Sequence, residues 1–284
     1  MNQYRISGFA DEIAPDLTTQ LEVIGRLGMQ HIEMRGVDGD NLINHSDESV
    51  KKIKQRLDAA GVTLSALGSP LGKIGITDEF APHMESFKRA VEIAHRMDCN
   101  RIRMFSFYLP EGKTAEYRGE VIERLGQFVD YAKANDVVLL HENEKGIYGE
   151  MAAECLDLMK QFYGANFKAI FDFANFVQAG QDTLEAYEML KPYIAYIHVK
   201  DAILENGKVV PAGMGDGNVA KILTDLSHNG FDGYLSLEPH LFGFTGFAAL
   251  EKDGVSIQDT GKVLSGSEAF TLAHDSLLKI LAQI

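Results

Sequence analysis

Tryptophan is absent from the 284-residue chain, and cysteine occurs only twice, at Cys99 and Cys155. The two cysteines form neither a CxxC pair nor a zinc-finger spacing, and two thiols do not build a disulfide framework. A reduced, cytoplasmic protein is the simplest interpretation of this cysteine usage.

Long hydrophobic runs are also missing. No uncharged apolar stretch of the sequence approaches the roughly 18 residues that a membrane-spanning helix needs. The first residues, MNQYRISGFADEI, contain no apolar segment of signal-peptide length. We therefore expect no membrane partner.

Basic residues are in the minority. The chain has 27 Lys and Arg against 41 Asp and Glu, which gives a net charge of −14. A surface this negative repels phosphate backbones, so we expect no nucleic-acid partner. Hydrophobic residues at 45% and charged residues at 24% are ordinary globular usage and exclude disorder, collagen and coiled coil.

Strand-like runs recur along the whole chain, with amphipathic stretches such as Ser46–Ala60 and Phe80–Asp98 between them. The eight runs are Tyr4–Phe9, His31–Arg35, Thr63–Leu67, Arg101–Ser106, Val137–Glu142, Lys168–Asp172, Ile194–Val199 and Tyr234–Glu238. Their starts lie about 33 residues apart on average, which is the length of a βα unit. Together with the absence of a linker, this spacing predicts one domain over residues 1–284, a closed (β/α)8 TIM barrel. An open doubly wound sheet is the alternative.

Glycine and serine residues support the predicted boundaries of the helices. Gly28, Gly61 and Gly230 each follow a helical pattern and precede an apolar residue, as a left-handed helix C-terminus does. Ser46 is a suitable helix start. One stretch, His240–Gly266, is long for a βα loop and carries three phenylalanines. We predict that it forms a lid over the barrel mouth, and that the helix Ser267–Ile284 closes the ring.

Four strands end in a polar side chain. Glu142, Asp172, His198 and Glu238 each follow an apolar run, on four successive strands. Side chains at the C-terminal ends of barrel strands converge on one rim. Three buried carboxylates repel one another unless a cation lies between them. Three oxygen ligands and one nitrogen suit Mn²⁺, Mg²⁺, Co²⁺ or Zn²⁺. Isolated rim residues with water partners are the alternative for each residue taken alone.

The segments HENE, DFAN, HVKD and LEPH, in this order, resemble the xylose-isomerase-like barrel superfamily. More closely, the chain is similar to sugar phosphate isomerases and epimerases over essentially its whole length. The resemblance implies one divalent metal bound by Glu142, Asp172, His198 and Glu238, with Glu142 and Glu238 acting as acid and base. Ketose 3-epimerases of this type carry His where this chain has Asn175, and Gly-Glu-Gly where it has Gly213-Met214-Gly215. The resemblance therefore leaves the substrate open.

Other polar residues flank these strand ends. Lys73 lies in the glycine-rich segment GSPLGKIG, and Lys200 and His240 each lie two residues beyond a predicted ligand. Glu33 and Arg35 alternate on the second strand. The predicted substrate contacts are Lys73, Lys200, His240, Asn175, Glu33 and Arg35. Lys73 and Lys200, together with Arg35, would hold an anionic group of the substrate. A surface lysine or an internal salt bridge is the alternative at these positions.

Neighbouring residues have less specific interpretations. His141 is expected to point at the helical layer as a hydrogen-bonded structural residue. Asp11 and Glu12 either cap a helix or face the substrate, and Glu144 could also face the mouth. Phe105, Phe107 and Tyr108 suit either a pocket wall or the core.

The leading function hypothesis is a metal-dependent isomerase or epimerase of a sugar, sugar phosphate or related polyol. It would transfer a proton through an enediolate. A lyase of keto-polyol or dehydroshikimate type, using the same site, is the alternative. An apurinic endonuclease would require further metal ligands and a basic groove, which the charge of −14 opposes. A non-catalytic sugar-binding protein is the fourth hypothesis. The sequence leaves the oligomeric state open, a homo-oligomer included.

Overall fold

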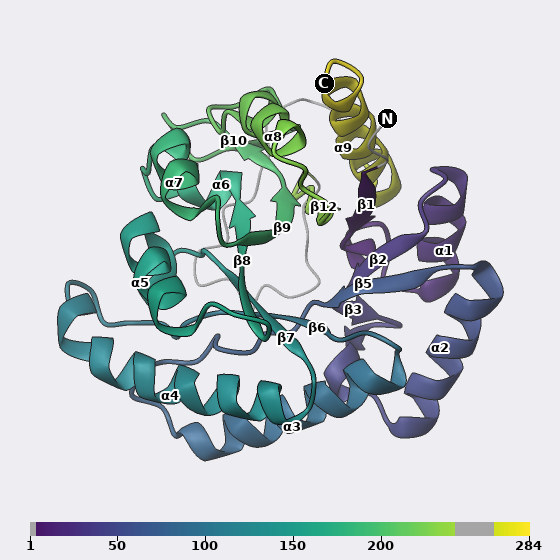
Figure 1. Cartoon of the computed structure of the whole chain (residues 1–284). Helices are drawn as coiled ribbons and strands as arrows, with labels where there is room; N and C mark the ends of the chain where they lie inside the picture. Colours follow the sequence, from purple (N-terminus) through teal and green to yellow (C-terminus); the bar gives the residue numbers. More distant parts are fainter. Residues whose placement is uncertain (1–3, 242–263) are drawn as a thin grey trace.

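Eight parallel strands curve into a nearly closed barrel (Figure 1) in the computed structural model, which describes residues 4–241 and 264–284. The strands are β1 (Arg5–Gly8), β2 (His31–Met34), β5 (Thr63–Leu67), β6 (Arg101–Met104), β7 (Val138–Glu142), β8 (Phe167–Asp172), β9 (Ile194–Val199) and β12 (Tyr234–Leu237). They pair in the order β1-β12-β9-β8-β7-β6-β5-β2. A parallel bridge between Phe9 and Glu33 brings the two ends of this order together. The predicted (β/α)8 barrel is confirmed.

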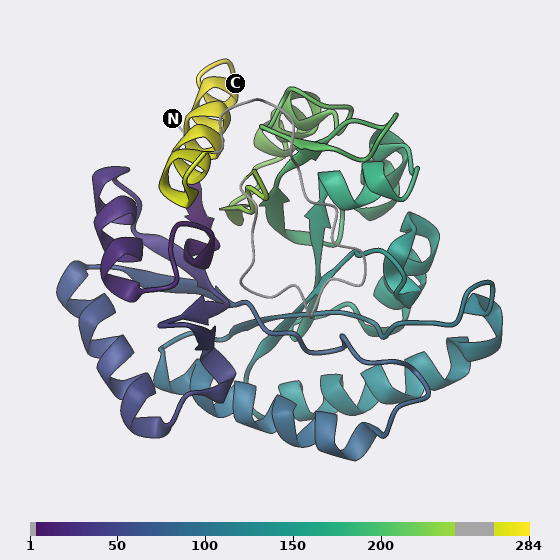
Figure 2. The ribbon, with the colours of Figure 1, turned by 180° about the vertical axis from the view of Figure 1, so that it is seen from behind.

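Helices surround the strands on the outside, as the two opposite views in Figures 1 and 2 show. They are α1 (Leu17–Arg26), α2 (Asp47–Ala60), α3 (Phe80–Arg96), α4 (Thr114–Ala134), α5 (Ala152–Phe162), α6 (Phe173–Gln178), α7 (Thr183–Leu190), α8 (Val219–His228) and α9 (Gly266–Leu281). Helix α9 contacts β12 and the short 3-10 helix η1 (Ala10–Glu12). The last helix therefore closes the ring, beginning one residue before the predicted start.

The predicted helix boundaries have the expected chemistry. Gly28, Gly61 and Gly230 all adopt positive φ angles, of 69°, 68° and 74°. Any side chain would strain such a left-handed position, so glycine suits the turn into the next strand. Ser46 caps α2, because its Oγ accepts the backbone N–H of Ser49.

The strands have apolar side chains toward the helices and an unusual proportion of polar ones toward the barrel axis. The helix-facing layer is a continuous core that includes Phe87, Phe107 and Phe128. The apolar cluster around Tyr196 is much smaller, and polar Ser7 and Ser65 are fully buried near it. Ser7 Oγ and Ser65 Oγ lie 2.6 Å apart, although they come from different strands. The barrel interior is therefore partly a hydrogen-bonded network.

Two short antiparallel hairpins were not predicted. Strands β3 (Gly36–Val37) and β4 (Asp40–Asn41) pair after β2, and β10 (Asp201–Ala202) pairs with β11 (Val209–Val210) after β9. Both lie in βα loops and shape the rim of the barrel. Each paired segment is only two residues long, too short for a periodic sequence pattern.

Cys99 and Cys155 are free and buried, and burial raises the pKa of both thiols. This agrees with the expectation of no disulfide framework.

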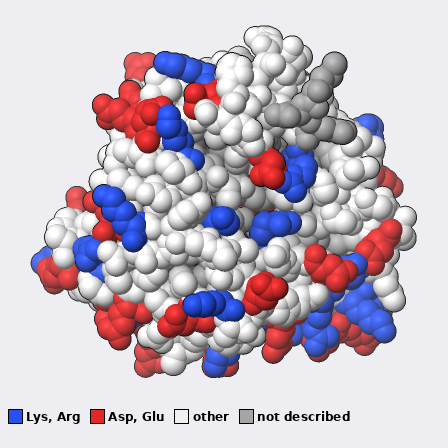
Figure 3. Space-filling view, in the orientation of Figure 1, with Lys and Arg blue, Asp and Glu red and all other residues white. Residues whose placement is uncertain are grey.

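None of the described helices is both long and apolar enough to cross a membrane. Figure 3 shows basic side chains interspersed with acidic ones over the face it displays. The predicted cytoplasmic location and the single domain over residues 1–284 stay predictions.

Candidate metal centre

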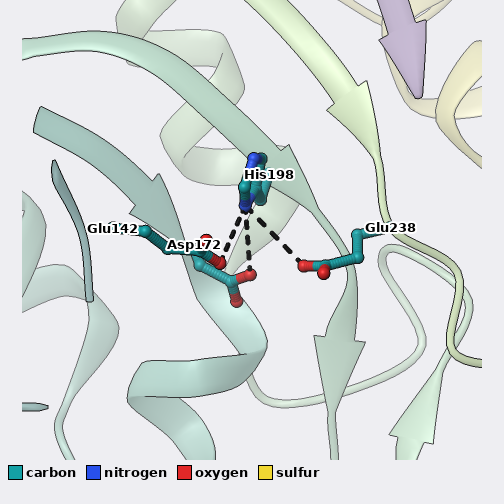
Figure 4. Close-up of side chains that lie close together, drawn as sticks. All are labelled: Glu142, Asp172, His198 and Glu238. Carbon is teal, nitrogen blue, oxygen red and sulfur yellow. Dashed lines mark hydrogen bonds and ion pairs between the residues drawn. The ribbon is translucent and has the colours of Figure 1, made fainter. Parts of the chain in front are cut away.

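Four side chains from successive strands meet at the C-terminal end of the barrel and point toward one another (Figure 4). Glu142, Asp172 and His198 lie at or near the ends of β7, β8 and β9, and Glu238 directly follows β12. Parallel pairing places Asp172 opposite His198, and His198 opposite Ser236, which precedes Glu238 by two residues. Each of the four residues is at most 3% exposed. The predicted convergence of these residues is therefore present in the structure.

The imidazole of His198 lies at the centre of the group. Its Nδ1 is 2.9 Å from Glu142 Oε1, 3.7 Å from Glu238 Oε2 and 3.9 Å from Asp172 Oδ2. The four residues each offer one ligand atom, and these atoms all lie within 4.8 Å of one another. Three carboxylate oxygens and one imidazole nitrogen at this spacing suit a single divalent cation.

Two observations on the buried charges agree with a cation here. Asp172 Oδ2 is buried and accepts no hydrogen bond from the described residues, although the ammonium of Lys200 lies 3.2 Å from it. The carboxylates also outnumber the permanent cations around the centre, six to three. The acids are Asp11, Glu12, Glu33, Glu142, Asp172 and Glu238, and the bases are Arg35, Arg103 and Lys200. Buried charge needs compensation, so the residues present fit a divalent ion.

The protonation of the group follows from its neighbours. Burial raises the pKa of Glu142, but His198 and Arg103 more than offset this and bring it to about 2. Lys200 likewise holds the pKa of Glu238 well below its usual range against the effect of burial. Burial raises the pKa of Asp172 to about 7, although Lys200 opposes the rise. The two glutamates are therefore ionised at neutral pH and available as ligands or bases.

Lys200 is not a surface lysine. Its Nζ lies 2.9 Å from Glu238 Oε2 and 3.2 Å from Asp172 Oδ2, and its side chain is 4% exposed. The ammonium therefore lies among the predicted ligands. Lys73 Nζ lies 3.0 Å from Glu144 Oε2 and 4.4 Å from the centre of the Phe105 ring, and its side chain is 10% exposed. Both lysines are paired with carboxylates, and neither points into bulk solvent.

Arg35 forms the opposite side of the centre. Its guanidinium is paired with Asp11 at 2.8 Å, contacts Glu12 at 3.6 Å, and reaches Glu238 Oε1 at 3.5 Å. His240 Nε2 lies 3.4 Å from both Glu238 Oε1 and Glu12 Oε1. Asp11 and Glu12 therefore belong to the rim and hold these basic groups against Glu238. Neither caps helix α1, whose first turn is capped by Asp16.

Asn175 and Asn143 brace the carboxylates. Asn175 donates its backbone N–H to Asp172 Oδ1 at 2.8 Å, because Asp172 caps the short helix α6. Its side-chain Nδ2 donates to Asn143 O at 2.8 Å and lies 3.4 Å from Glu142 Oε1. Asn143 Oδ1 in turn accepts the backbone N–H of Asp172. Asn175, predicted as a substrate contact, thus lies directly beside two of the predicted ligand residues.

Glu33 requires a correction. It was expected at the mouth beside Arg35, but its side chain is completely buried and faces His198 Nε2 at 3.1 Å. That nitrogen lies on the far side of the imidazole from the other carboxylates. The side chain points into the barrel, as alternation along the strand predicts, but Glu33 on β2 precedes Arg35 by two residues and therefore lies deeper below the mouth. A direct substrate contact by Glu33 does not fit this position.

Arg103 was missed by the sequence argument. Its Nη1 lies 3.2 Å from Glu142 Oε2 and 3.9 Å from Glu238 Oε1, so it contacts both glutamates. Its guanidinium lies over the rings of Phe9 and Phe105, and its buried Nε has no hydrogen-bond partner among the described residues. The predicted metal site contained only the last polar residue of each contributing strand, and Arg103 lies one residue before the end of its strand. An arginine inside the buried strand Arg101–Met104 was the available signal.

The remaining predicted residues divide between site and core. His141 is buried and lies 3.0 Å from Ser106 Oγ, and burial lowers its pKa to about 4, as suits a neutral structural histidine. Phe105 lies beneath Lys73 and Arg103, whereas Phe107 packs on Phe128 in the outer core. The predicted lid, His240–Gly266, falls largely outside the described residues.

Comparison with known proteins identifies the family. The family model described as xylose isomerase-like TIM barrel matches residues 21–253, which is most of the chain. The chain belongs to this family. A 3-dehydroshikimate dehydratase of Bacillus anthracis is 20% identical over 175 residues, covering 61% of this chain and 62% of that protein. The chain spans less than two thirds of the length of the curated relatives it matches.

Solved structures of the family share the fold. An L-ribulose 3-epimerase structure superposes with a TM-score of 0.74 and 16% identity, covering 99% of this chain and 95% of that one. A xylose isomerase-like TIM barrel protein from Mycobacterium smegmatis, in complex with magnesium, gives a TM-score of 0.68 and 16% identity, covering 99% and 97% of the two chains. At such identities the likeness shows the fold alone.

Proposed function

We propose that this protein is a divalent-metal-dependent isomerase or epimerase acting on a sugar, sugar phosphate or related polyol. The observation that carries the proposal is the convergence of Glu142, Asp172, His198 and Glu238, whose ligand atoms lie within 4.8 Å of one another. These four residues would hold Mn²⁺, Mg²⁺, Co²⁺ or Zn²⁺. When bound, such an ion supplies Lewis acidity that polarises a substrate carbonyl and favours loss of the neighbouring carbon-bound proton.

Glu142 and Glu238 are the proposed acid and base. Both reach Arg103 Nη1, from β7 and from the residue after β12, so they approach one space from two directions. Low pKa values keep both carboxylates ionised, ready to accept a proton. With one glutamate on each face of the substrate, removal and return of a proton on opposite faces gives epimerisation. A single glutamate moving the proton between neighbouring carbons gives an aldose–ketose shift.

Substrate oxygens would bind to the basic groups around the glutamates. Lys73, Lys200, Arg35 and His240 line the same end of the barrel, and each contacts a carboxylate there. These contacts orient the basic groups before substrate arrives, which limits the reorganisation on binding. An anionic group of a sugar phosphate is the proposed partner of Lys73, Lys200 and Arg35.

A lyase is the second candidate function. The Bacillus anthracis relative named 3-dehydroshikimate dehydratase supports it, although at 20% identity over part of the chain. Elimination of water begins with the same proton abstraction and differs in expelling a β-hydroxyl. Lys200 and His240, both beside Glu238, could then protonate the departing oxygen.

Proton exchange in D₂O separates these possibilities. Ketoses, aldoses, their phosphates and 3-dehydroshikimate are incubated with protein and Mn²⁺, Mg²⁺, Co²⁺ or Zn²⁺, and recovered material is analysed by NMR and mass spectrometry. The expected result is metal-dependent deuterium at a carbon next to a carbonyl, together with an epimer or isomer. Loss of water instead assigns the lyase reaction. Turnover without deuterium contradicts the two-glutamate scheme, because a hydride shift transfers the hydrogen without exchange.

Variants of the two glutamates test whether these residues carry out the exchange. Glu142→Gln and Glu238→Gln should each reduce exchange by at least about 100-fold, the lower range of general acid–base contributions. Glu205→Gln is the matched control, because Glu205 is exposed in the turn between β10 and β11. Equal exchange in all three variants would overturn the assignment of the glutamates.

A further inference from the structure

Beneath the four ligand residues lies a second buried carboxylate group that the proposed reaction does not use. Glu33 Oε2 lies 3.1 Å from His198 Nε2, 2.9 Å from Tyr196 Oη and 2.7 Å from Ser236 Oγ. Glu33, Tyr196, His198 and Ser236 are all 0% exposed. Three donors from β9 and β12 thus converge on one oxygen of a carboxylate from β2.

The network continues down the barrel axis. Tyr196 Oη lies 2.7 Å from Ser65 Oγ, which lies 2.6 Å from Ser7 Oγ. Ser65 Oγ also donates to the carbonyl of Ile32 at 3.1 Å, and Tyr196 Oη donates to Glu33, so the three hydroxyls form a contiguous series that ends at Glu33. The hydrogen-bonded network that ends at the Glu33 carboxylate therefore includes groups from four other strands, two of which contact it directly.

Glu33 determines which imidazole nitrogen is available to a cation. Tyr196 Oη and Ser236 Oγ both donate to Glu33 Oε2, so this oxygen is an acceptor and the imidazole nitrogen that faces it carries a proton. Nδ1, the nitrogen that faces Glu142, Asp172 and Glu238, is then the one that can lose its proton to an ion. An imidazole that donates its second N–H to a carboxylate is fixed in tautomer and orientation and is a stronger ligand.

We propose that Glu33, held by Tyr196 and Ser236, is a positioning residue that fixes His198 with Nε2 protonated and Nδ1 directed at the metal centre. This inference rests on the proposed function for the metal site itself. It assigns Glu33 neither to the substrate nor to the ligands, and it gives the polar interior of the barrel a role in metal affinity.

Metal affinity tests the proposal without reference to turnover. Glu33→Ala and Glu33→Gln should weaken Mn²⁺ and Co²⁺ binding, measured by chelator competition, by roughly 10–100-fold, the usual cost of losing such a partner. The alanine variant should lose more, because glutamine keeps an acceptor oxygen but no charge. Tyr196→Phe and Ser236→Ala should lose less, because each removes one support of Glu33 and leaves its contact with His198.

A matched control separates positioning from general destabilisation. Tyr187→Phe removes a 2.7 Å hydroxyl–carboxylate hydrogen bond to Asp225 on the outer helices. It should lower stability as Tyr196→Phe does and leave metal affinity unchanged. A spectroscopic readout is also available: with Zn²⁺ bound and histidine ¹⁵N-labelled, wild type should show His198 as the Nε2–H tautomer. The visible spectrum of the Co²⁺ form should change in Glu33→Gln and stay as in wild type in Tyr187→Phe.

The outcomes distinguish this inference from the function on which it rests. If wild type binds no divalent ion, the proposed metal function fails and this inference with it. If wild type binds an ion and both Glu33 variants bind it equally well, only the positioning role is overturned. If the Glu33 variants do not fold, Tyr196→Phe and Ser236→Ala decide, since unchanged affinity and an unchanged Co²⁺ spectrum in both contradict the proposal.

Discussion

Lys200 shows most clearly how single residues balance the charge of the proposed metal centre. Its ammonium lies within 3.2 Å of carboxylate oxygens of both Asp172 and Glu238, and it is almost completely buried. An ammonium at this position compensates the carboxylates and also competes with a metal ion for them. Removal of the Lys200 ammonium should therefore lower the stability of the metal-free protein and raise its affinity for metal.

Lys200→Met should lower the free energy of unfolding in the presence of a chelator by about 3 kcal/mol, because it leaves buried carboxylates without their cation. Added Mn²⁺ should restore most of this loss, and the apparent affinity for Mn²⁺ should rise above that of wild type. Urea unfolding with EDTA and with Mn²⁺ measures both effects. Lys160→Met, at an exposed helix position, is the control. Weaker Mn²⁺ binding in Lys200→Met would contradict this charge balance.

The convergence of the four proposed ligand residues could be predicted from the sequence, whereas the residues that support them could not. Glu142, Asp172, His198 and Glu238 each end an apolar run, and a parallel barrel brings such ends together whatever its details. Glu33 and Arg103 each lie one residue inside the end of their strand, so the groups that they face depend on how neighbouring strands are placed beside them. Only the assembled barrel reveals that Glu33 lies behind His198 and Arg103 between the glutamates.

Among the elements, the loop after β9 is organised by one carboxylate. Asp201 is completely buried and accepts backbone N–H groups from Ala202, Gly213, Gly215 and Gly217 at 2.8–3.0 Å. This includes the Gly213-Met214-Gly215 segment at which the chain departs from the ketose 3-epimerases. The loop directly follows Lys200, so Asp201 connects the shape of the rim to the position of that lysine.

Asp201→Asn should destabilise the fold by about 3 kcal/mol, because an amide NH₂ then faces backbone donors that lose their acceptor. The matched control is Asp216→Asn, which affects a single N–H of Leu204 at an exposed position and should cost less than about 1 kcal/mol. Urea unfolding followed by circular dichroism measures both. Equal losses in the two variants would contradict the organising role of Asp201.

Helix α3 holds the loop that carries Lys73 through a neutral histidine. His83 Nε2 accepts the backbone N–H of Gly72 at 2.7 Å, so the ring must be unprotonated on that nitrogen. Burial and the nearby Arg124 lower the pKa of His83 from 6.5 to about 4. The unfolded chain therefore binds more protons than the folded one between these values, and stability should fall as pH drops from about 6.5 toward 4.

Wild type and His83→Gln, unfolded in urea at pH 7.5, 5.5 and 4.5, measure this contribution. The glutamine keeps an acceptor oxygen without a titrating group, so its stability should decrease less over this range. His141, whose pKa is also lowered to about 4, contributes equally to both proteins and cancels in the comparison. Identical pH dependence in the two proteins would show that His83 is not the titrating contact.

The strands and main helices were predictable for a reason that does not extend to the loops. Each barrel strand is a buried run bounded by turn signals, and each outer helix has an apolar face, so both leave a periodic pattern. The helix α6 begins immediately after Asp172, and the hairpins β3–β4 and β10–β11 pair only two residues. Such short elements are determined by side-chain contacts such as those of Asp172 and Asp201, which a pattern does not record.

For the molecule as a whole, the net charge of −14 and the six carboxylates buried around the candidate metal centre both favour the binding of a cation. The folded chain concentrates negative charge at one end of the barrel, where three permanent cations compensate only part of it. A divalent ion that binds the folded state and not the unfolded chain stabilises the fold through mass action.

Thermal unfolding should therefore respond to metal. At a Mn²⁺ concentration 100 times the dissociation constant, the stabilisation is about 2.7 kcal/mol, which for a protein of this size raises Tm by roughly 5 °C or more. Differential scanning calorimetry with Mn²⁺ and with EDTA measures the shift, with equimolar Na₂SO₄ as an ionic-strength control. A Tm that is the same under all three conditions would contradict a folded-state metal site.

The central claim is that Glu142, Asp172, His198 and Glu238 together bind one divalent ion. Isothermal titration with Mn²⁺, together with the metal content after gel filtration, tests it most directly when wild type is compared with Asp172→Ala/His198→Ala. We predict one ion per chain in wild type and no measurable binding in the double variant, with circular dichroism confirming that both are folded. Equal metal content in the two proteins would contradict the account.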